Sequence, residues 1–279
     1  MIQTGKVIAF YQKCTMLTDK CSVLSFSGGM DSTSLLLKLI SKNHIVHAIS
    51  FKYGQKHEVE VELAKNNISY LKNNGFKDKV IHKVFDISNI LSNFNSSLID
   101  KNQDVPEGYY ESDMMKSTFV PNRNAIFFSL IYGYAISISK NYDDKISISL
   151  GAHSGDHAIY PDCRLDFFES LFKSLQLGNW GSDNIELSVP YIDMDKKNIL
   201  LDAEKSIKYL DLDFDTIFKN TITSYAPTKN GVSSGRTGSD IERILAFDSI
   251  KKKDPIKYQD SWENVLKNAK ETEQEYLNG

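Results

Sequence analysis

The sequence predicts an α/β fold in which a mainly parallel sheet is sandwiched between helices. Short apolar runs alternate along the chain with segments of helical periodicity, which is the pattern of repeated β–α–β units. The first apolar run ends at a pair of glycines and is followed by a leucine-rich segment, as expected where a buried strand turns sharply into a helix. A small helical subdomain is expected at the C-terminal end.

The elements follow one another in a regular order. Strands are predicted at residues 23–26, 44–51, 80–85, 145–150 and 186–190. Helices are predicted at about 33–40, 58–73, 124–139, 165–177, 196–209 and 240–249, and a charged tail is expected after the last of them. Residues 7–10 could form an added short strand or hairpin. Residues 88–116 are polar and irregular, which favours a flexible lid over a functional site.

The composition excludes several classes of protein. The 279 residues carry a net charge of −3 with lysine and arginine dispersed, so no nucleic-acid-binding surface is expected. No apolar run is long enough to cross a bilayer, and the N-terminus does not resemble a signal peptide. The three cysteines include no CxxC pair, which indicates a reducing compartment. We expect a cytoplasmic protein that binds neither membrane nor nucleic acid.

The turn at residues 27–32, SGGMDS, is the strongest functional motif. Gly28 and Gly29 let the backbone approach a ligand closely, and the first N–H groups of the following helix would face an anion. Ser27 and Ser32 add hydroxyl donors, and Asp31 supplies a carboxylate that could hold Mg²⁺. The alternative is an ordinary strand–helix connector. The GxxxxGK[ST] pattern is absent, which disfavours transfer of a γ-phosphate.

The strand, the SGGMDS turn and the helix together resemble the pyrophosphate-binding loop of the ATP pyrophosphatase (PP-loop) superfamily. Further segments are FKYGQKHE at 51–58, STFVPNRN at 117–124, GAHSGDH at 151–157 and YPDCR at 160–164. Taken in order, from about residue 23 to 247, these segments resemble the QueC family of 7-cyano-7-deazaguanine synthases. The resemblance implies a Rossmann-like fold of the adenine nucleotide alpha hydrolase type.

The resemblance also implies a reaction, that of an ATP-dependent carbon–nitrogen ligase forming AMP and pyrophosphate. ATP would adenylate the carboxylate of 7-carboxy-7-deazaguanine, and ammonia would displace AMP to give an amide. A second adenylation would dehydrate the amide to the nitrile. ATP and Mg²⁺ are the implied cofactors. The sequence leaves open the acceptor nucleophile, the number of ATP molecules used and whether the product is amide or nitrile.

The resemblance assigns residues to the nucleotide. The implied ATP-binding set is Ser27, Gly28, Gly29, Asp31, Ser32, Phe51, Tyr53, Gln55 and Arg123. Within it, Asp31, Ser32 and Arg123 are expected to be catalytic, with Mg²⁺ held through Asp31. Tyr53 is the better candidate to stack on adenine. Arg123 opens a helix, where its guanidinium could contact the α-phosphate; the alternative is a surface arginine after a proline turn.

A second implied set binds the deazaguanine: His153, Asp156, Tyr160, Asp162 and Arg164. Asp156 and Asp162 could read the donors and acceptors on one edge of the planar ring, and Tyr160 could stack on its face. Arg164 could hold the substrate carboxylate or the adenylate. Alternatively, Asp162 could act as the N-cap of the following helix.

The chain departs from the family at a C-terminal zinc site. The family's four cysteine positions are occupied here by Ser224, Ser234, Thr237 and Asp240, while the spacing is kept. Hydroxyls are poor zinc ligands and one carboxylate cannot replace four thiolates, so no zinc is expected. We expect hydrogen bonds, Asp240 acting as a helix cap, or a partner to hold this loop instead.

The expected organisation is an N-terminal extension (1–22), a PP-loop ATP-binding and catalytic domain (23–220) and a degenerate zinc-loop and helical region (221–279). Besides ammonia, a protein amine is a candidate acceptor, because QueC-like proteins also occur in antiviral defence, where such a ligase could join a deazaguanine to a protein. A non-catalytic nucleotide-binding subunit is a less favoured alternative, and a homodimer is expected only by analogy.

Overall fold

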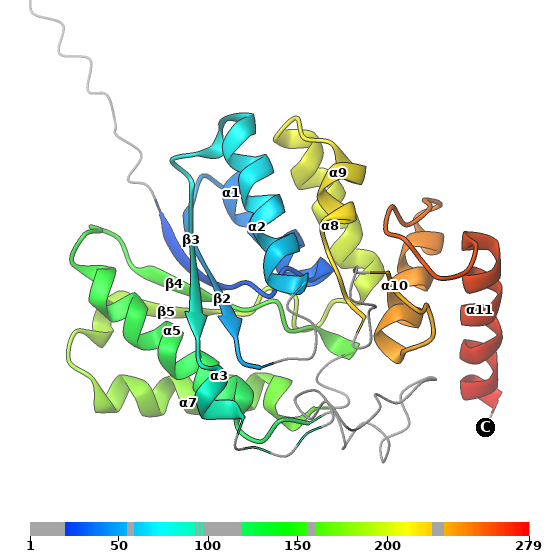
Figure 1. The fold of residues 1–279 in the computed structure, drawn as a ribbon. Helices are drawn as coiled ribbons and strands as arrows, with labels where there is room; N and C mark the ends of the chain where they lie inside the picture. The colour runs from blue at the N-terminus through cyan, green and yellow to red at the C-terminus, as the bar shows by residue number, and fades with distance from the viewer. Residues whose placement is uncertain are drawn as a thin grey trace, which may run out of the picture.

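A computed structural model of the chain describes residues 20–54, 59–92, 94, 96, 119–155, 160–224 and 232–278 (Figure 1). Its centre is a five-stranded sheet in the order β3-β2-β1-β4-β5, and every pair of neighbouring strands is parallel. The strands are β1 (Cys21–Ser25), β2 (Ile45–Lys52), β3 (Val80–Asp86), β4 (Ile146–Ser149) and β5 (Ile185–Ser188). The predicted parallel sheet is confirmed.

Helices cover both faces of this sheet, as predicted. The helices are α1 (Met30–Ser41), α2 (Val59–Leu71), α3 (Ser88–Leu91), α5 (Arg123–Ser139), α7 (Leu165–Gly178), α8 (Lys196–Tyr209), α9 (Phe214–Lys219), α10 (Gly238–Ser249) and α11 (Trp262–Asn278). Short helical turns are η1 (Lys72–Phe76), η3 (Pro161–Cys163) and η4 (Ser182–Asn184). In Figure 1, α1, α2, α8 and α9 lie on one face and α3, α5 and α7 on the other.

The alternation of side chains along β1 explains the two layers. Leu24 and Phe26 point into a cluster that contains residues of α1, α2 and α8. Cys21 and Val23 point the opposite way, into a cluster with residues of α5 and α7. Since both faces of the strand are buried, the sequence there reads as a continuous apolar run rather than an alternating one.

The C-terminal end differs from the prediction. The charged tail expected after residue 249 contains the helix α11, whose Val265 and Ala269 are buried against Ile241 and Ile244 of α10. The short helix α9 was also not predicted. Of the lid expected at 88–116, residues 88–91 form α3, and most of the remainder lies outside the described residues, as does the expected strand at 7–10.

One fully buried arginine ties α10 to the chain that follows α9. Arg243 donates from Nε and Nη2 to the carboxylate of Asp254 at 2.6 and 2.9 Å. It also donates to Thr221 Oγ1 at 2.8 Å, to Thr223 Oγ1 at 3.1 Å and to the Phe218 carbonyl at 3.2 Å.

No helix in the described part of the chain is both long and apolar enough to cross a membrane.

Candidate active site

The turn between β1 and α1 has the geometry expected of an anion-binding loop. Gly28 has φ +82°, and a Cβ there would lie 2.8 Å from Ala64 Cβ of α2, so only glycine fits. Ser27 Oγ accepts a 3.2 Å hydrogen bond from the Gly29 N–H and lies 3.0 Å from Ser32 Oγ. The two serines thereby close the loop, and the first turn of α1 points its N–H groups toward the carboxyl edge of the sheet.

A cavity of about 310 Å³ opens at this edge. It is lined by eight of the predicted site residues: Ser27, Gly29, Asp31, Ser32, Phe51, Tyr53, Arg123 and Tyr160. Among the described residues, Gly28, His153, Asp162 and Arg164 do not line it, while Gln55 and Asp156 lie outside the described residues. Ligands of open parallel sheets bind at such an edge, where the strand order reverses, here at β1.

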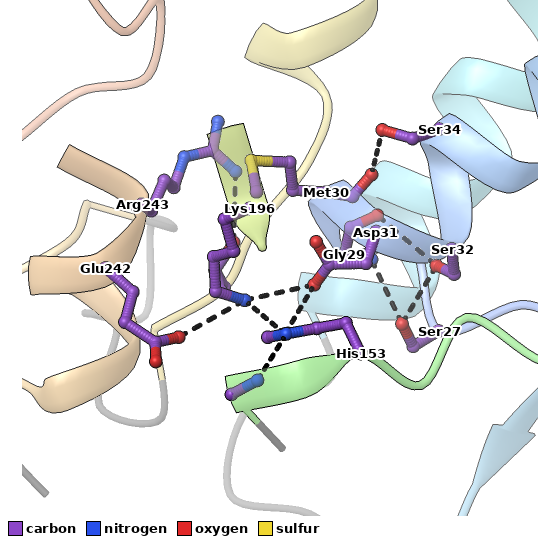
Figure 2. A network of polar contacts seen from close by, with 12 residues as sticks. Ser27, Gly29, Met30, Asp31, Ser32, Ser34, His153, Lys196, Glu242 and Arg243 are labelled. Carbon is purple, nitrogen blue, oxygen red and sulfur yellow. Dashed lines mark hydrogen bonds and ion pairs between the residues drawn. The ribbon is translucent and has the colours of Figure 1, made fainter. Parts of the chain in front are cut away.

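Lys196 is a candidate site residue that none of the sequence motifs indicates. Its ammonium lies 3.1 Å from Asp31 Oδ2, 3.0 Å from His153 Nε2 and 3.4 Å from Glu242 Oε2 (Figure 2). The side chain is buried and lines the cavity. Figure 2 shows the four side chains converging from α1, α8, α10 and the segment after β4. We call Asp31, His153, Lys196 and Glu242 the Lys196 cluster.

The Lys196 cluster keeps Asp31 ionised. Burial would raise the pKa of this carboxyl, but Lys196, His153 and Arg243 outweigh that effect and hold the pKa below its usual value. Asp31 Oδ2 faces Lys196, whereas the buried Oδ1 has no hydrogen-bond partner among the described residues. A carboxylate oxygen in that condition can still accept a cation.

Gly155 shows how tightly the Lys196 cluster is enclosed. Its N–H donates a 3.0 Å hydrogen bond to His153 Nδ1. A Cβ at this position would lie 2.8 Å from His153 Cε1 and 2.9 Å from Glu242 Oε1. A side chain at 155 would therefore displace the His153 ring and the Glu242 carboxylate. The motif GAHSGDH contains this glycine, although no pattern in the motif distinguishes it.

Aromatic rings form another wall of the cavity. Phe51 stacks on Phe127 with ring centroids 4.1 Å apart and an interplanar angle of 5°. The Arg123 guanidinium, at the start of α5, lies over the Tyr53 ring at 5.8 Å. Glu60 also lines the cavity, and its burial raises its pKa to about 7 against the opposing effect of Arg123. A planar, charged ligand would therefore meet stacking surfaces and a cation together.

The predicted substrate segment is only partly assembled around the cavity. Tyr160 and Cys163 line it, and Asn124 Nδ2 donates to the Asp162 carbonyl at 3.3 Å. Asp162 is buried, which raises its pKa. It does not cap α7, because the N-cap there is Arg164 and no side chain caps it. Arg164 is exposed.

The four positions of the family's zinc site come together through hydrogen bonds. Asp240 Oδ2 accepts from Thr237 Oγ1 at 2.8 Å, from Ser224 Oγ at 3.0 Å and from Ser234 Oγ at 3.4 Å. Ser233 Oγ donates to Asp240 Oδ1 at 2.6 Å. All five residues are buried, and Thr237 and Asp240 form a capping box at the start of α10. The predicted hydrogen bonds and helix cap are present, and we call this group the Asp240 hub.

Comparison with known proteins agrees with these motifs. The family model described as "Queuosine biosynthesis protein QueC" matches residues 21–251. The 7-cyano-7-deazaguanine synthase of Caldicellulosiruptor saccharolyticus is 40% identical over 239 residues, covering 85% of this chain and 95% of the relative. The enzyme of the same name from Pseudoalteromonas translucida is 38% identical over 243 residues, covering 87% of this chain and 100% of the relative.

Proposed function

The chain belongs to the QueC family, and we propose that it is an ATP-dependent carbon–nitrogen ligase acting on 7-carboxy-7-deazaguanine. A carboxylate oxygen of the substrate attacks the α-phosphorus of ATP, and the bond to pyrophosphate breaks. The nitrogen nucleophile then attacks the acyl carbon of the adenylate and AMP leaves, giving the amide. With ammonia as acceptor, a second adenylation on the amide oxygen followed by loss of AMP gives the nitrile.

The observation that carries this proposal is the meeting of Asp31 and Lys196 beside the N-terminus of α1. The positive end of the helix, the loop hydroxyls and the Lys196 ammonium form one anion-binding surface at the cavity wall. Arg123 lies on the cavity wall as well and supplies a second cation for the triphosphate. These groups suit a reaction whose leaving group is pyrophosphate.

Magnesium fits this site. The unpartnered, buried Asp31 Oδ1 is a hard oxygen donor, the type of ligand that Mg²⁺ prefers when it also binds phosphates. When bound, the cation supplies neutralisation of the charge that builds up on the leaving pyrophosphate. Asp31 would hold it, Lys196 would stay beside the phosphates, and Ser27 and Ser32 would donate to phosphate oxygens.

Zinc does not fit the Asp240 hub. The donors there are three hydroxyls and one carboxylate at the family's ligand positions, and the carboxylate already accepts their hydrogen bonds. Zinc sites of this type need thiolates or imidazoles. We therefore infer that the C-terminal loop folds without a metal.

The acceptor is tested by measuring pyrophosphate release from ATP with 7-carboxy-7-deazaguanine, with and without ammonium, followed by mass spectrometry of every product. Amide or nitrile with ammonium supports ammonia as acceptor. AMP and pyrophosphate without a small-molecule product support an adenylate that awaits a protein amine, the second candidate. Absence of ATP cleavage under all conditions contradicts the ligase and favours a binding subunit.

A further inference from the structure

We propose that Glu242 is a positioning residue that holds Lys196 against the phosphates of ATP, so that helix α10 takes part in ATP cleavage. This inference rests on the proposed cleavage of ATP at the site. Glu242 is not one of the residues that the family motifs single out. It is reached only through the fold, which brings the first turns of α10 to the start of α8.

The ion pair itself is well enclosed. Lys196 Nζ lies 3.4 Å from Glu242 Oε2, and the two side chains are 9% and 18% exposed. A buried lysine that loses one of two carboxylate partners keeps less compensation for its charge, which disfavours its buried position. Lys196 has two carboxylate partners in the described structure, Asp31 and Glu242.

The two carboxylates have different tasks when the nucleotide binds. Asp31 is the second residue of α1, directly after the glycine turn, and it is the residue suited to the magnesium ion. If Asp31 Oδ1 held a cation, that cation would share the negative charge of Asp31, and Glu242 would be the other carboxylate that balances the Lys196 ammonium. The ion pair with Glu242 directs the Lys196 ammonium toward the negative charge that develops on the leaving pyrophosphate.

The position of Glu242 depends on the Asp240 hub. Asp240 and Glu242 lie two residues apart at the start of α10, and the hub fixes that start through the Thr237–Asp240 capping box. Gly155 leaves room for the Glu242 carboxylate on the other side, because a Cβ there would lie 2.9 Å from Glu242 Oε1. The hub therefore fixes the helix start from which Glu242 reaches Lys196.

A double-mutant cycle tests the proposal with Glu242→Ala, Lys196→Met and the two combined. We expect Glu242→Ala to lower kcat for pyrophosphate release about tenfold, with KM for ATP raised less than about threefold. Glu242→Gln, whose amide oxygen can still accept from the ammonium, should recover part of the loss. In the Lys196→Met background, Glu242→Ala should cause no further loss.

The same cycle is measured on the dissociation constant of Mg·ATP by calorimetry, without the deazaguanine. Glu242→Ala should weaken binding about threefold in the wild-type background and not at all in Lys196→Met. This arm does not require turnover, so a failed ligase reaction and a failed role for Glu242 give different results. Additive effects in both arms, or faster turnover in Glu242→Ala, would overturn the proposal.

Glu204→Ala is the matched control. Glu204 pairs with Lys252 at 3.3 Å, nearly the distance of the Glu242–Lys196 pair, but both side chains are exposed. Its removal should change kcat and the Mg·ATP dissociation constant by less than about twofold. Melting temperatures of all variants show whether each one is folded at the assay temperature. A loss in Glu204→Ala equal to that in Glu242→Ala would contradict a specific role for Glu242.

Discussion

Asp31 and Lys196 form a 3.1 Å ion pair although 165 positions separate them in the sequence. The pair joins α1, the helix that follows the glycine turn, to the first residue of α8. Both helices lie on the same face of the sheet. An anionic loop residue and a buried cation thus share one end of the cavity. Each of them is the counter-charge of the other at this end of the cavity.

Replacing Asp31 by asparagine should lower pyrophosphate release by about 100-fold or more, the usual effect of removing one preorganised charge from a reacting centre. The fold should persist, because asparagine keeps the shape and Lys196 retains Glu242. Steady-state kinetics and far-UV circular dichroism of the variant check both statements. Full turnover in Asp31→Asn would show that the phosphate-loop assignment is wrong.

Gly155→Ala should impair both stability and turnover. The new methyl group would lie under 3 Å from His153 Cε1 and Glu242 Oε1, and overpacking of this kind costs roughly 1–3 kcal/mol. Gly133→Ala is the control, since no atom lies within 4 Å of a Cβ there and the residue is inside α5. That variant should be stabilised by up to about 1 kcal/mol. Urea unfolding measures the free energy of unfolding of both variants. Equal changes in the two variants would contradict crowding at position 155.

Asp240→Ala should destabilise the protein by about 3 kcal/mol or more, because several buried hydroxyls lose their acceptor together. Asp248→Ala, which removes an exposed ion pair with Lys270 from the same helix, should cost less than about 1 kcal/mol. Denaturant titrations give both values. A chelator should leave the melting temperature of the wild-type protein unchanged, and a fall would indicate a metal in the hub.

Glu60 should make stability depend on pH. Its pKa rises from the usual 4.5 to about 7 in the folded protein, chiefly through burial. Between those values the folded state keeps a proton that the unfolded state has released, so stability falls as pH rises through this window. Glu60→Gln removes the effect and should therefore gain more stability relative to wild type at pH 7.5 than at pH 5. Urea unfolding at the two pH values measures this; an equal difference at both contradicts the raised pKa.

The turn between β1 and α1 was predictable because its determinants are contiguous. The apolar run, the glycine pair and the leucine-rich segment occupy consecutive positions, and local sterics fix each of them. Lys196 was not predictable in the same way. It stands beside Lys197 at the start of a predicted helix, where a lysine pair is typical of a solvated surface, and only the sheet topology brings it to Asp31.

The C-terminal region shows both outcomes. The four hub positions were found because the family's spacing survives without its cysteines, whereas Ser233 was not foreseen as a further donor. The sequence predicts a charged tail where α11 lies, because the buried apolar positions of this helix, Val265 and Ala269, stand among many charged residues. Tertiary packing of a narrow stripe stabilises this helix, and that packing leaves little signal in the composition.

The buried Arg243 also governs how the protein comes apart. Its guanidinium is paired with Asp254 on one side and donates to Thr221 Oγ1 and the Phe218 carbonyl on the other, so α10 cannot leave without breaking these buried hydrogen bonds to the main body. Local fraying of the C-terminal part is suppressed as long as the main body is intact. Melting should therefore be concerted, with α10 and the sheet lost in a single cooperative step.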